Sequence, residues 1–458
     1  MSAKRLAASA PVPATGPQVV LTPLKPALIA GLAHTLPVLV RVQAPDADPS
    51  VVPVRQPYHL SLVIDRSGSM SGKPLQEAVR CSSHIVDRLL PTDVASLVMF
   101  DHKATLLAPA QPVGDRRALH HALAGIQCGG STDLYGGWAT GADSLLPGAA
   151  SASIARIILL TDGNANSGEL TEAQAIAERC TSAATRGITT STYGLGRDFN
   201  ETLMIAMARA GGGNHYYGDT AADLFEPFAE EFDLISNLYA RQVRLSIATC
   251  PGVGMKVLND YPMDARAGVP AISLPDIPWG AEAWVLVELS IPAGFEPLPG
   301  MPLLQAGVTG TSLERAPIAF PDAVLAMDTV SPQVWDALTA DSLVHSRHAE
   351  VEASRLLEQA RTAAEADDWD RVQALIDSAG RRFGDQPWVK EVLASLEQIA
   401  EQRDQARFGK ESMYSAMKMR SRVASKDEGQ YNSVQEAVMP RFLRRDGSQG
   451  TKGSRRQP

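Results

Sequence analysis

The feature that most constrains the fold is a regular alternation of short apolar segments and longer helical patterns between residues 58 and 237. The apolar segments have the length of buried strands, and the helical patterns are long enough to cross back over a sheet. Strands joined by such crossovers lie parallel in one sheet with helices on its faces. The sequence therefore predicts a doubly wound α/β domain with a mostly parallel, six-stranded sheet.

The boundaries of these elements follow from the ends of the patterns. We expect strands at residues 58–65, 94–100, 103–109, 154–161, 188–194 and 214–217. We expect helices at residues 75–90, 116–126, 134–146, 171–186, 201–209 and 221–238. The connection between the second strand and the third is very short, which predicts a hairpin and one antiparallel edge strand.

A group of oxygen-bearing side chains follows the first of these strands. Asp65, Ser67 and Ser69 occupy alternate positions directly after an apolar run. Ser and Asp are also common in ordinary turns, so this loop alone does not require a ligand. Thr132 and Asp162 lie at two further junctions of strand, loop and helix, and open α/β sheets bind ligands outside the carboxyl ends of their strands. Because hard cations such as Mg²⁺ prefer oxygen ligands, the sequence predicts a metal site formed by these five residues.

With this motif and spacing, residues 57–238 resemble the von Willebrand factor A domain family, also called integrin I-like, in its bacterial form. In that family Asp-x-Ser-x-Ser, a distant Thr and a distant Asp form the metal-ion-dependent adhesion site. The resemblance implies that the five residues above bind Mg²⁺, with Mn²⁺ or Ca²⁺ as alternatives. It implies that both Ser hydroxyls touch the metal, and that an Asp or Glu of a protein partner replaces a water on it. In some relatives the last helix shifts when the site binds its ligand.

We therefore expect a metal-dependent protein-binding module and not an enzyme. The loops at residues 70–73, 135–138 and 164–169 would surround the site and select the partner. The resemblance implies an AAA-type ATPase or a signalling-operon protein as partner classes. Two alternatives stay open. One is a metal-dependent hydrolase or phosphatase, with Asp133 as an extra carboxylate, although two-metal chemistry normally uses more close carboxylates than this motif supplies. The other is a metal-independent scaffold that binds through the C-terminal helices.

Segments with a different pattern flank the α/β domain. Short β-branched runs separated by Pro and Gly occur in residues 18–56 and 239–330. This arrangement predicts one β-sandwich into which the domain at residues 57–238 is inserted. From residue 331 to residue 409 apolar residues recur at three- and four-residue steps, which predicts a small helical bundle.

Composition limits the kinds of partner, the state of the cysteines and the location of the protein. The formal net charge of −9 argues against a nucleic-acid binder, which needs clustered Lys and Arg. The four cysteines show neither a disulfide nor a zinc pattern, so we expect reduced, mostly buried thiols, with Cys128 an inert neighbour of the metal site. We expect a disordered leader at residues 1–17 and a basic, largely disordered tail at residues 410–458. No apolar run is long enough to span a membrane, and the leader lacks the apolar core of a signal peptide, so we expect a cytoplasmic protein.

Overall fold

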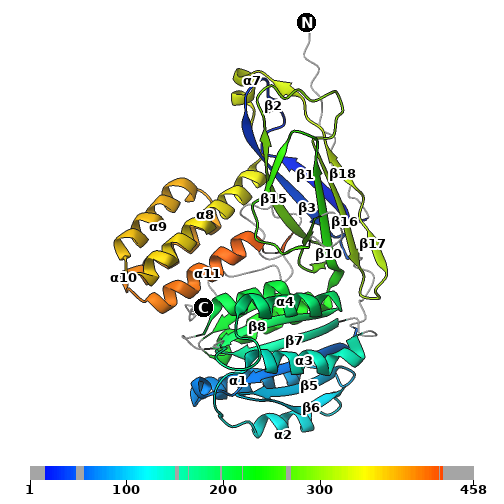
Figure 1. The fold of residues 1–458 in the computed structure, drawn as a ribbon, viewed down its shortest axis with the longest axis vertical. Coiled ribbons are helices and arrows are strands. Elements are labelled where there is room, and N and C mark those ends of the chain that lie inside the picture. The colour runs from blue at the N-terminus through cyan, green and yellow to red at the C-terminus, as the bar shows by residue number, and fades with distance from the viewer. Residues whose placement is uncertain are drawn as a thin grey trace, which may run out of the picture.

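The protein contains an α/β domain, a pair of antiparallel sheets and a set of C-terminal helices (Figure 1). The structure is a computed structural model. It describes residues 16–47, 56–149, 154–162, 165–195, 199–218, 220–264, 270–421 and 423–425. Within these ranges no helix combines the length and the apolar character that a membrane crossing needs.

The α/β domain is built on one mixed, six-stranded sheet. In sheet order its strands are β6 (Ala104–Pro112), β5 (Val94–Phe100), β4 (Tyr58–Asp65), β7 (Ile154–Thr161), β8 (Ile188–Leu195) and β9 (Gly212–Gly218). Neighbouring strands are parallel except β5 and β6, which form the hairpin. The prediction of a mostly parallel sheet with one antiparallel edge strand is therefore confirmed.

Helices cover both faces of this sheet, which explains why every residue of β7 and β8 is buried. One face packs against α1 (Lys73–Arg88), α2 (Arg117–Ala124) and α6 (Ala221–Ser236). The other face packs against α3 (Leu134–Ala149), α4 (Ala173–Thr185) and α5 (Glu201–Ala210). All six helices occur where the sequence predicts them, and their ends differ by up to three residues.

Two antiparallel sheets flank this domain in the sequence and share one apolar core. The first sheet contains β1 (Gln18–Pro23), β3 (His34–Gln43), β15 (Ala281–Ile291), β11 (Gly254–Val257) and β20 (Ala424–Ser425). The second contains β12 (Met263–Asp264), β13 (Ala271–Ser273), β10 (Leu238–Thr249), β16 (Leu304–Thr311), β17 (Pro317–Ala319), β14 (Ile277–Pro278) and β18 (Ala323–Leu325). A short parallel pair, β2 (Leu28–Ile29) and β19 (Thr329–Val330), lies beside them.

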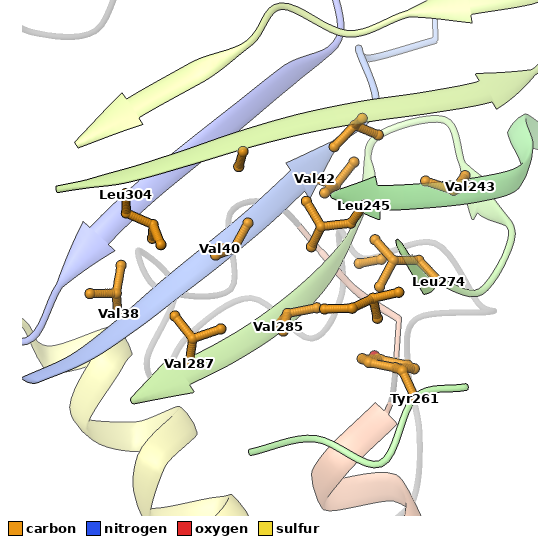
Figure 2. Packing of buried hydrophobic residues seen from close by; sticks show 14 of the residues in the cluster. Val38, Val40, Val42, Val243, Leu245, Tyr261, Leu274, Val285, Val287 and Leu304 are labelled. Carbon is orange, nitrogen blue, oxygen red and sulfur yellow. The ribbon is translucent and has the colours of Figure 1, made fainter. Parts of the chain in front are cut away.

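The shared core comes from alternate residues on strands of both sheets. Figure 2 shows Val40 and Val285 of the first sheet facing the same interior as Leu245 and Leu304 of the second. In β16 buried residues alternate with more exposed ones, as expected for a strand with only one face in a core. Only Asn237 separates α6 from β10, so the α/β domain joins the second sheet without a linker.

The C-terminal helices begin with the short α7 (Pro332–Ala337). The longer ones are α8 (Ser342–Glu365), α9 (Trp369–Phe383), α10 (Pro387–Glu401) and α11 (Gln405–Ser421). Apolar residues from α8 to α11 form one core. Figure 1 shows α11 returning between the other helices and the α/β domain.

The prediction of a basic, largely disordered tail from residue 410 is wrong for residues 410–421, which belong to α11. Many of the polar residues that suggested a tail are buried there, among them Lys410, Glu411 and Lys418. A helix with buried charges has no clear apolar periodicity, so the sequence pattern could not reveal it. The predicted leader up to residue 15 and the tail from residue 426 lie outside the described residues.

Candidate metal centre

The first predicted ligand loop begins where β4 ends. Asp65 is the last residue of this strand and is fully buried, because β5 and β7 lie on its two sides. Its Oδ1 accepts a hydrogen bond from the backbone N–H of Ser67 at 2.7 Å, which turns the chain sharply. The hydroxyl oxygens of Ser67 and Ser69 lie 3.2 Å apart. Three predicted ligands therefore share one tight loop, and Ser69 is exposed to solvent.

The loop that carries Thr132 is joined to this first loop by its backbone. The N–H of Gly68 donates to the carbonyl of Gly130, and the N–H of Gly129 donates to the carbonyl of Arg66, each at 2.7 Å. Thr132 is buried, with 1% of its surface exposed. The two loops are therefore fixed against each other although they are far apart in the sequence.

Asp162 reaches the same edge of the sheet from β7. Its neighbour Thr161 ends that strand and donates its hydroxyl proton to the Oδ2 of Asp65 at 2.5 Å. On the other side of Asp162 along the chain, the Oδ1 of Asn166 accepts from the N–H of Thr132 at 2.8 Å, and the N–H of Asn166 donates to the Thr132 carbonyl at 3.2 Å. The three segments that carry the predicted ligands therefore meet at the carboxyl edge of the sheet.

The electrostatics of this edge suit a cation. The pKa of Asp65 is raised to about 6, mainly by burial and in part by the charge of Asp162, while hydrogen bonds from Thr161 and Ser67 oppose the rise. A bound cation would favour the ionised form of both carboxyl groups. Two carboxylates and three hydroxyl groups are hard oxygen donors, so these residues fit Mg²⁺ or a similar divalent ion.

Asp101 supports both loops, and sequence reasoning missed it. Its Oδ2 lies 2.8 Å from the Nη2 of Arg66 and accepts from the N–H of Gly130 at 3.2 Å. Burial by itself would raise the pKa of Asp101, but hydrogen bonds from backbone N–H groups and the charge of Arg66 lower it below its ordinary value. Position 129 requires glycine, because a Cβ atom there would lie 1.9 Å from the Asp101 Oδ2. The paired glycines before Ser131 were the only sequence signal of this close approach.

Asp133, the extra carboxylate of the hydrolase alternative, has a structural role. Its Oδ1 accepts from the N–H of Gly136 at 2.8 Å, so it caps the first turn of α3. A Cβ atom at Gly136 or at Gly168 would lie 2.3 or 2.0 Å from an oxygen of this carboxylate. In the part of the chain that the structure describes, no group of three or more His, Cys, Asp or Glu side chains could hold a metal.

The structure agrees only in part with the predicted partner-selecting loops, because Met70 and Trp138 are buried in the core. Residues 70–73 follow Ser69 directly, and residues 135–138 form the first turn of α3. In the third loop Ser167 donates its hydroxyl proton to the hydroxyl of Ser131 at 3.2 Å. Gly163 and Asn164 lie outside the described residues.

The expectation that Cys128 is buried is wrong. Cys128 is exposed, and its Sγ lies 3.4 Å from the carbonyl oxygen of Ser67. Cys81 and Cys180 are buried as expected, and burial raises the pKa of both thiols. Cys128 differs because it lies in the loop between α2 and α3, whereas Cys81 and Cys180 lie on the inner faces of α1 and α4.

Comparison with known proteins identifies the α/β domain. Residues 59–230 match the sequence profile of the von Willebrand factor type A domain. This chain contains a von Willebrand factor type A domain. We refer to it below as the A domain.

Relatives with curated sequences match less than half of the chain. An uncharacterized protein of Synechocystis, sll0103, is 27% identical over 209 residues, which are 45% of this chain and 48% of that protein. Human inter-alpha-trypsin inhibitor heavy chain H4 is 30% identical over 190 residues, which are 38% of this chain and 20% of that protein. The chain therefore aligns with half or less of the length of these relatives.

Two solved structures are similar over more of the chain. A von Willebrand factor type A protein from Catenulispora acidiphila aligns with a TM-score of 0.65 at 17% identity, over 83% of this chain and 89% of that chain. The ArnB paralog VWA2 from Sulfolobus acidocaldarius aligns with a TM-score of 0.58 at 19% identity, over 89% of this chain and 98% of that chain. At these identities the likeness is one of fold alone.

Proposed function

We propose that the A domain binds a protein partner through a divalent cation. The residues that would hold the cation, most simply Mg²⁺, are Asp65, Ser67, Ser69, Thr132 and Asp162. The observation that carries this proposal is the meeting of three distant segments at one sheet edge, joined by hydrogen bonds between their loops. The matched family supports a role in metal-dependent protein interaction in general, because A domains are commonly modules of this kind.

The cation would supply a position to which a carboxylate of the partner can bind. Ser69 is exposed, whereas Asp65 and Thr132 are buried, so the site opens to solvent on the side of Ser69. An Asp or Glu side chain of the partner is the ligand that this arrangement suits, because hard cations prefer oxygen donors. The exposed residues 71–73, which follow Ser69 closely, would then select among partners.

We further propose where and with whom this module acts. Its partner would be a cytoplasmic protein, either an AAA-type ATPase or a product of a signalling operon, and the chain would be of the bacterial type. The two antiparallel sheets would form one β-sandwich with the A domain inserted between β3 and β10, and α8 to α11 would form a helical bundle. These two parts would hold the A domain so that its metal edge, the carboxyl edge of the sheet with the candidate ligands, stays accessible.

The proposal is tested by capture of partners from the native cell with the full chain as bait. Proteins that bind in Mg²⁺ and are released by EDTA should be absent when Asp65→Ala is the bait. Titration of the purified chain with Mg²⁺ or Mn²⁺ should give heat in the wild type and none in Asp65→Ala.

A matched control is Asp115→Ala, which removes an exposed carboxylate before α2. This variant should bind metal and partners as the wild type does. Partner binding that is unchanged after removal of the metal would contradict the proposal and favour a scaffold that acts through the C-terminal helices. Turnover of phosphoesters that requires Asp65 would favour the hydrolase.

A further inference from the structure

A cavity of about 640 Å³ lies where the A domain, the two-sheet unit and α11 meet. The A domain contributes residues of α4, α5, β8 and β9, and the two-sheet unit contributes residues of β10, β13 and β16. Met417 and Lys418 of α11 complete the wall. Figure 1 shows α4 on the side of the A domain that faces β10 and α11. This place is remote from the metal edge, because the cavity is lined by Thr189 and Gly212, which lie near the amino ends of β8 and β9.

Each of the three parts places one cation in the wall of this cavity. These cations are Arg209 from the A domain, Arg244 from β10 and Lys418 from α11. The acidic residue among the lining residues is Asp276, which lies 3.6 Å from the guanidinium of the buried Arg156. His215 also lines the cavity, but burial and the charge of Lys418 lower its pKa to about 3, so it is neutral at neutral pH. The wall is therefore positively charged.

Arg209 has no ion-pair partner among the described residues, although it is partly buried. The acidic groups near it are Asp260 and Glu358, and both are ion-paired with Arg420. Burial lowers the pKa of Arg209, and the charge of Arg420 adds to this effect. A partly buried guanidinium without its own carboxylate costs free energy that an anion bound in the cavity would recover.

The backbone of β10 is irregular where it borders the cavity. Gln242 has a φ of +52°, in the left-handed region that non-glycine residues rarely adopt, and it lies in a bulge between Arg241 and Arg244. Its N–H donates to the Oδ1 of Asp276, and its Nε2 donates to the carbonyl of Ala184 in α4. Bulges often re-aim side chains beside binding sites, and this one places Arg244 in the cavity wall.

Part of the remaining wall is apolar, with Ala208 from the A domain, Val243 and Leu274 from the two-sheet unit and Met417 from α11, and part is polar, with hydroxyl and amide side chains from the same strands and from α4. A cavity of this volume is much larger than one phosphate ion and lies in the range of small-molecule sites. We propose that it binds a small organic phosphate of nucleotide size, with the phosphate at Arg209 and the uncharged part against the apolar wall. Since the three cations come from three parts, such a ligand would fix these parts against one another.

The test uses the full chain in EDTA, so that the metal site plays no part and the two proposals fail separately. Three probes are compared by isothermal titration and thermal unfolding: AMP, inorganic phosphate and adenosine. AMP at about 100 times its dissociation constant should raise the melting temperature by roughly 2 °C or more. Phosphate should bind more weakly than AMP, and adenosine should not bind measurably.

Arg209→Gln should weaken AMP binding about tenfold or more, because it removes a charge-assisted contact. The matched control is Arg117→Gln on the exposed surface of α2, which should bind AMP as the wild type does. If Arg209→Gln does not fold, the partly exposed Arg244→Gln replaces it, with the same expected loss. The inference is overturned if AMP does not bind the wild type, if adenosine binds as tightly as AMP, or if the folded cavity variant retains full affinity.

Discussion

At the scale of single residues, the candidate metal site depends on a buried carboxylate, Asp65, whose ionised form is unfavourable without a cation. Asp65 is fully buried, and Asp162 is 6% exposed. Burial raises the pKa of Asp65, so its ionised form destabilises the metal-free fold. Residues that a functional site needs for binding often lower the stability of the free protein in this way.

Asp65→Asn should therefore be more stable than the wild type in EDTA at pH 7. The native pKa of Asp65 is about 6, which lies above its value in the unfolded chain. Between roughly pH 4 and 6 the carboxyl group is therefore protonated in the native state and ionised in the unfolded state. The wild type loses stability as the pH rises through this range. The substitution should raise the free energy of unfolding by about 3 kcal/mol at most at pH 7, and this increase should vanish near pH 4. Thermal unfolding across this range measures it, and Mg²⁺ should stabilise only the wild type. A variant that is less stable than the wild type at pH 7 in EDTA would contradict this reasoning.

Gly129→Ala should damage the same site by steric overlap. Its Cβ atom would lie 1.9 Å from the Oδ2 of Asp101, so the Thr132 loop must shift. We expect a loss of about 1–3 kcal/mol in the free energy of unfolding and weaker metal binding.

The control for this substitution is Gly380→Ala in α9, where no atom lies within 4 Å of the added Cβ. It should stabilise the protein by about 0.5–1 kcal/mol, because alanine favours helix more than glycine does. Urea unfolding compares the two variants. Equal effects at positions 129 and 380 would show that the overlap with Asp101 does not occur.

At the scale of elements, a buried ion pair fixes α6 against the sheet. Glu231 of α6 is ion-paired with Arg156 of β7, and both side chains are buried. The same carboxylate accepts hydrogen bonds from Ser191 at 2.6 Å, Asn214 at 2.7 Å and Tyr216 at 3.1 Å. Since α6 continues almost directly into β10, this network also determines where the second sheet is attached.

Glu231→Gln should destabilise the protein by about 3–5 kcal/mol at pH 7, because it removes the nearer of the two carboxylates beside the buried Arg156 and leaves Asp276 at 3.6 Å. Burial alone would raise the pKa of Glu231, but Arg156 and the hydrogen bonds lower it below its ordinary value. The stabilisation is thus present above pH 4 to 5 and is lost as the pH falls through the lowered native pKa. Urea unfolding at pH 7 measures the loss. Glu178→Gln on the exposed face of α4 should change stability by less than about 0.5 kcal/mol, and an equally small effect at Glu231 would refute the role of the ion pair.

At the scale of the whole molecule, α11 joins all three parts. Tyr414 packs edge to face on Tyr217 of β9, with ring centroids 5.7 Å apart, and Lys410 lies 4.2 Å from the ring centroid of Phe199. Arg420 at the other end is ion-paired with Asp260, which precedes the second sheet's β12. The helix therefore shields residues of β9, the edge strand of the A domain.

A chain that ends at Asp404 should be less stable and should self-associate, because loss of α11 exposes apolar residues beside the edge strand. The matched control ends at Ser425 and keeps both α11 and β20. Thermal unfolding and light scattering after gel filtration compare the two chains. A monomeric Asp404 chain with the melting temperature of the control would show that α11 does not protect the A domain.

The sequence by itself determined the A domain and the candidate ligands. Apolar runs such as β7 are fully buried, so their period and length reveal a parallel sheet, and the ends of its strands mark the edge where ligands gather. The polar loop after β4 was visible because side chains of one chemical kind interrupt an apolar pattern at a strand end. These features are local, and local patterns can be read from residue order.

Only the tertiary structure decided the roles of Asp101, Asp133 and α11. Asp101 and Asp133 look alike in the sequence, yet they act differently. Asp101 supports two loops that are far apart in the sequence, whereas Asp133 caps the helix that follows it and lies close to the distant Gly168. The polar α11 is buried because three parts of the chain surround it. Its burial, like the cavity beside it, depends on contacts between residues far apart in the sequence, which no local pattern encodes.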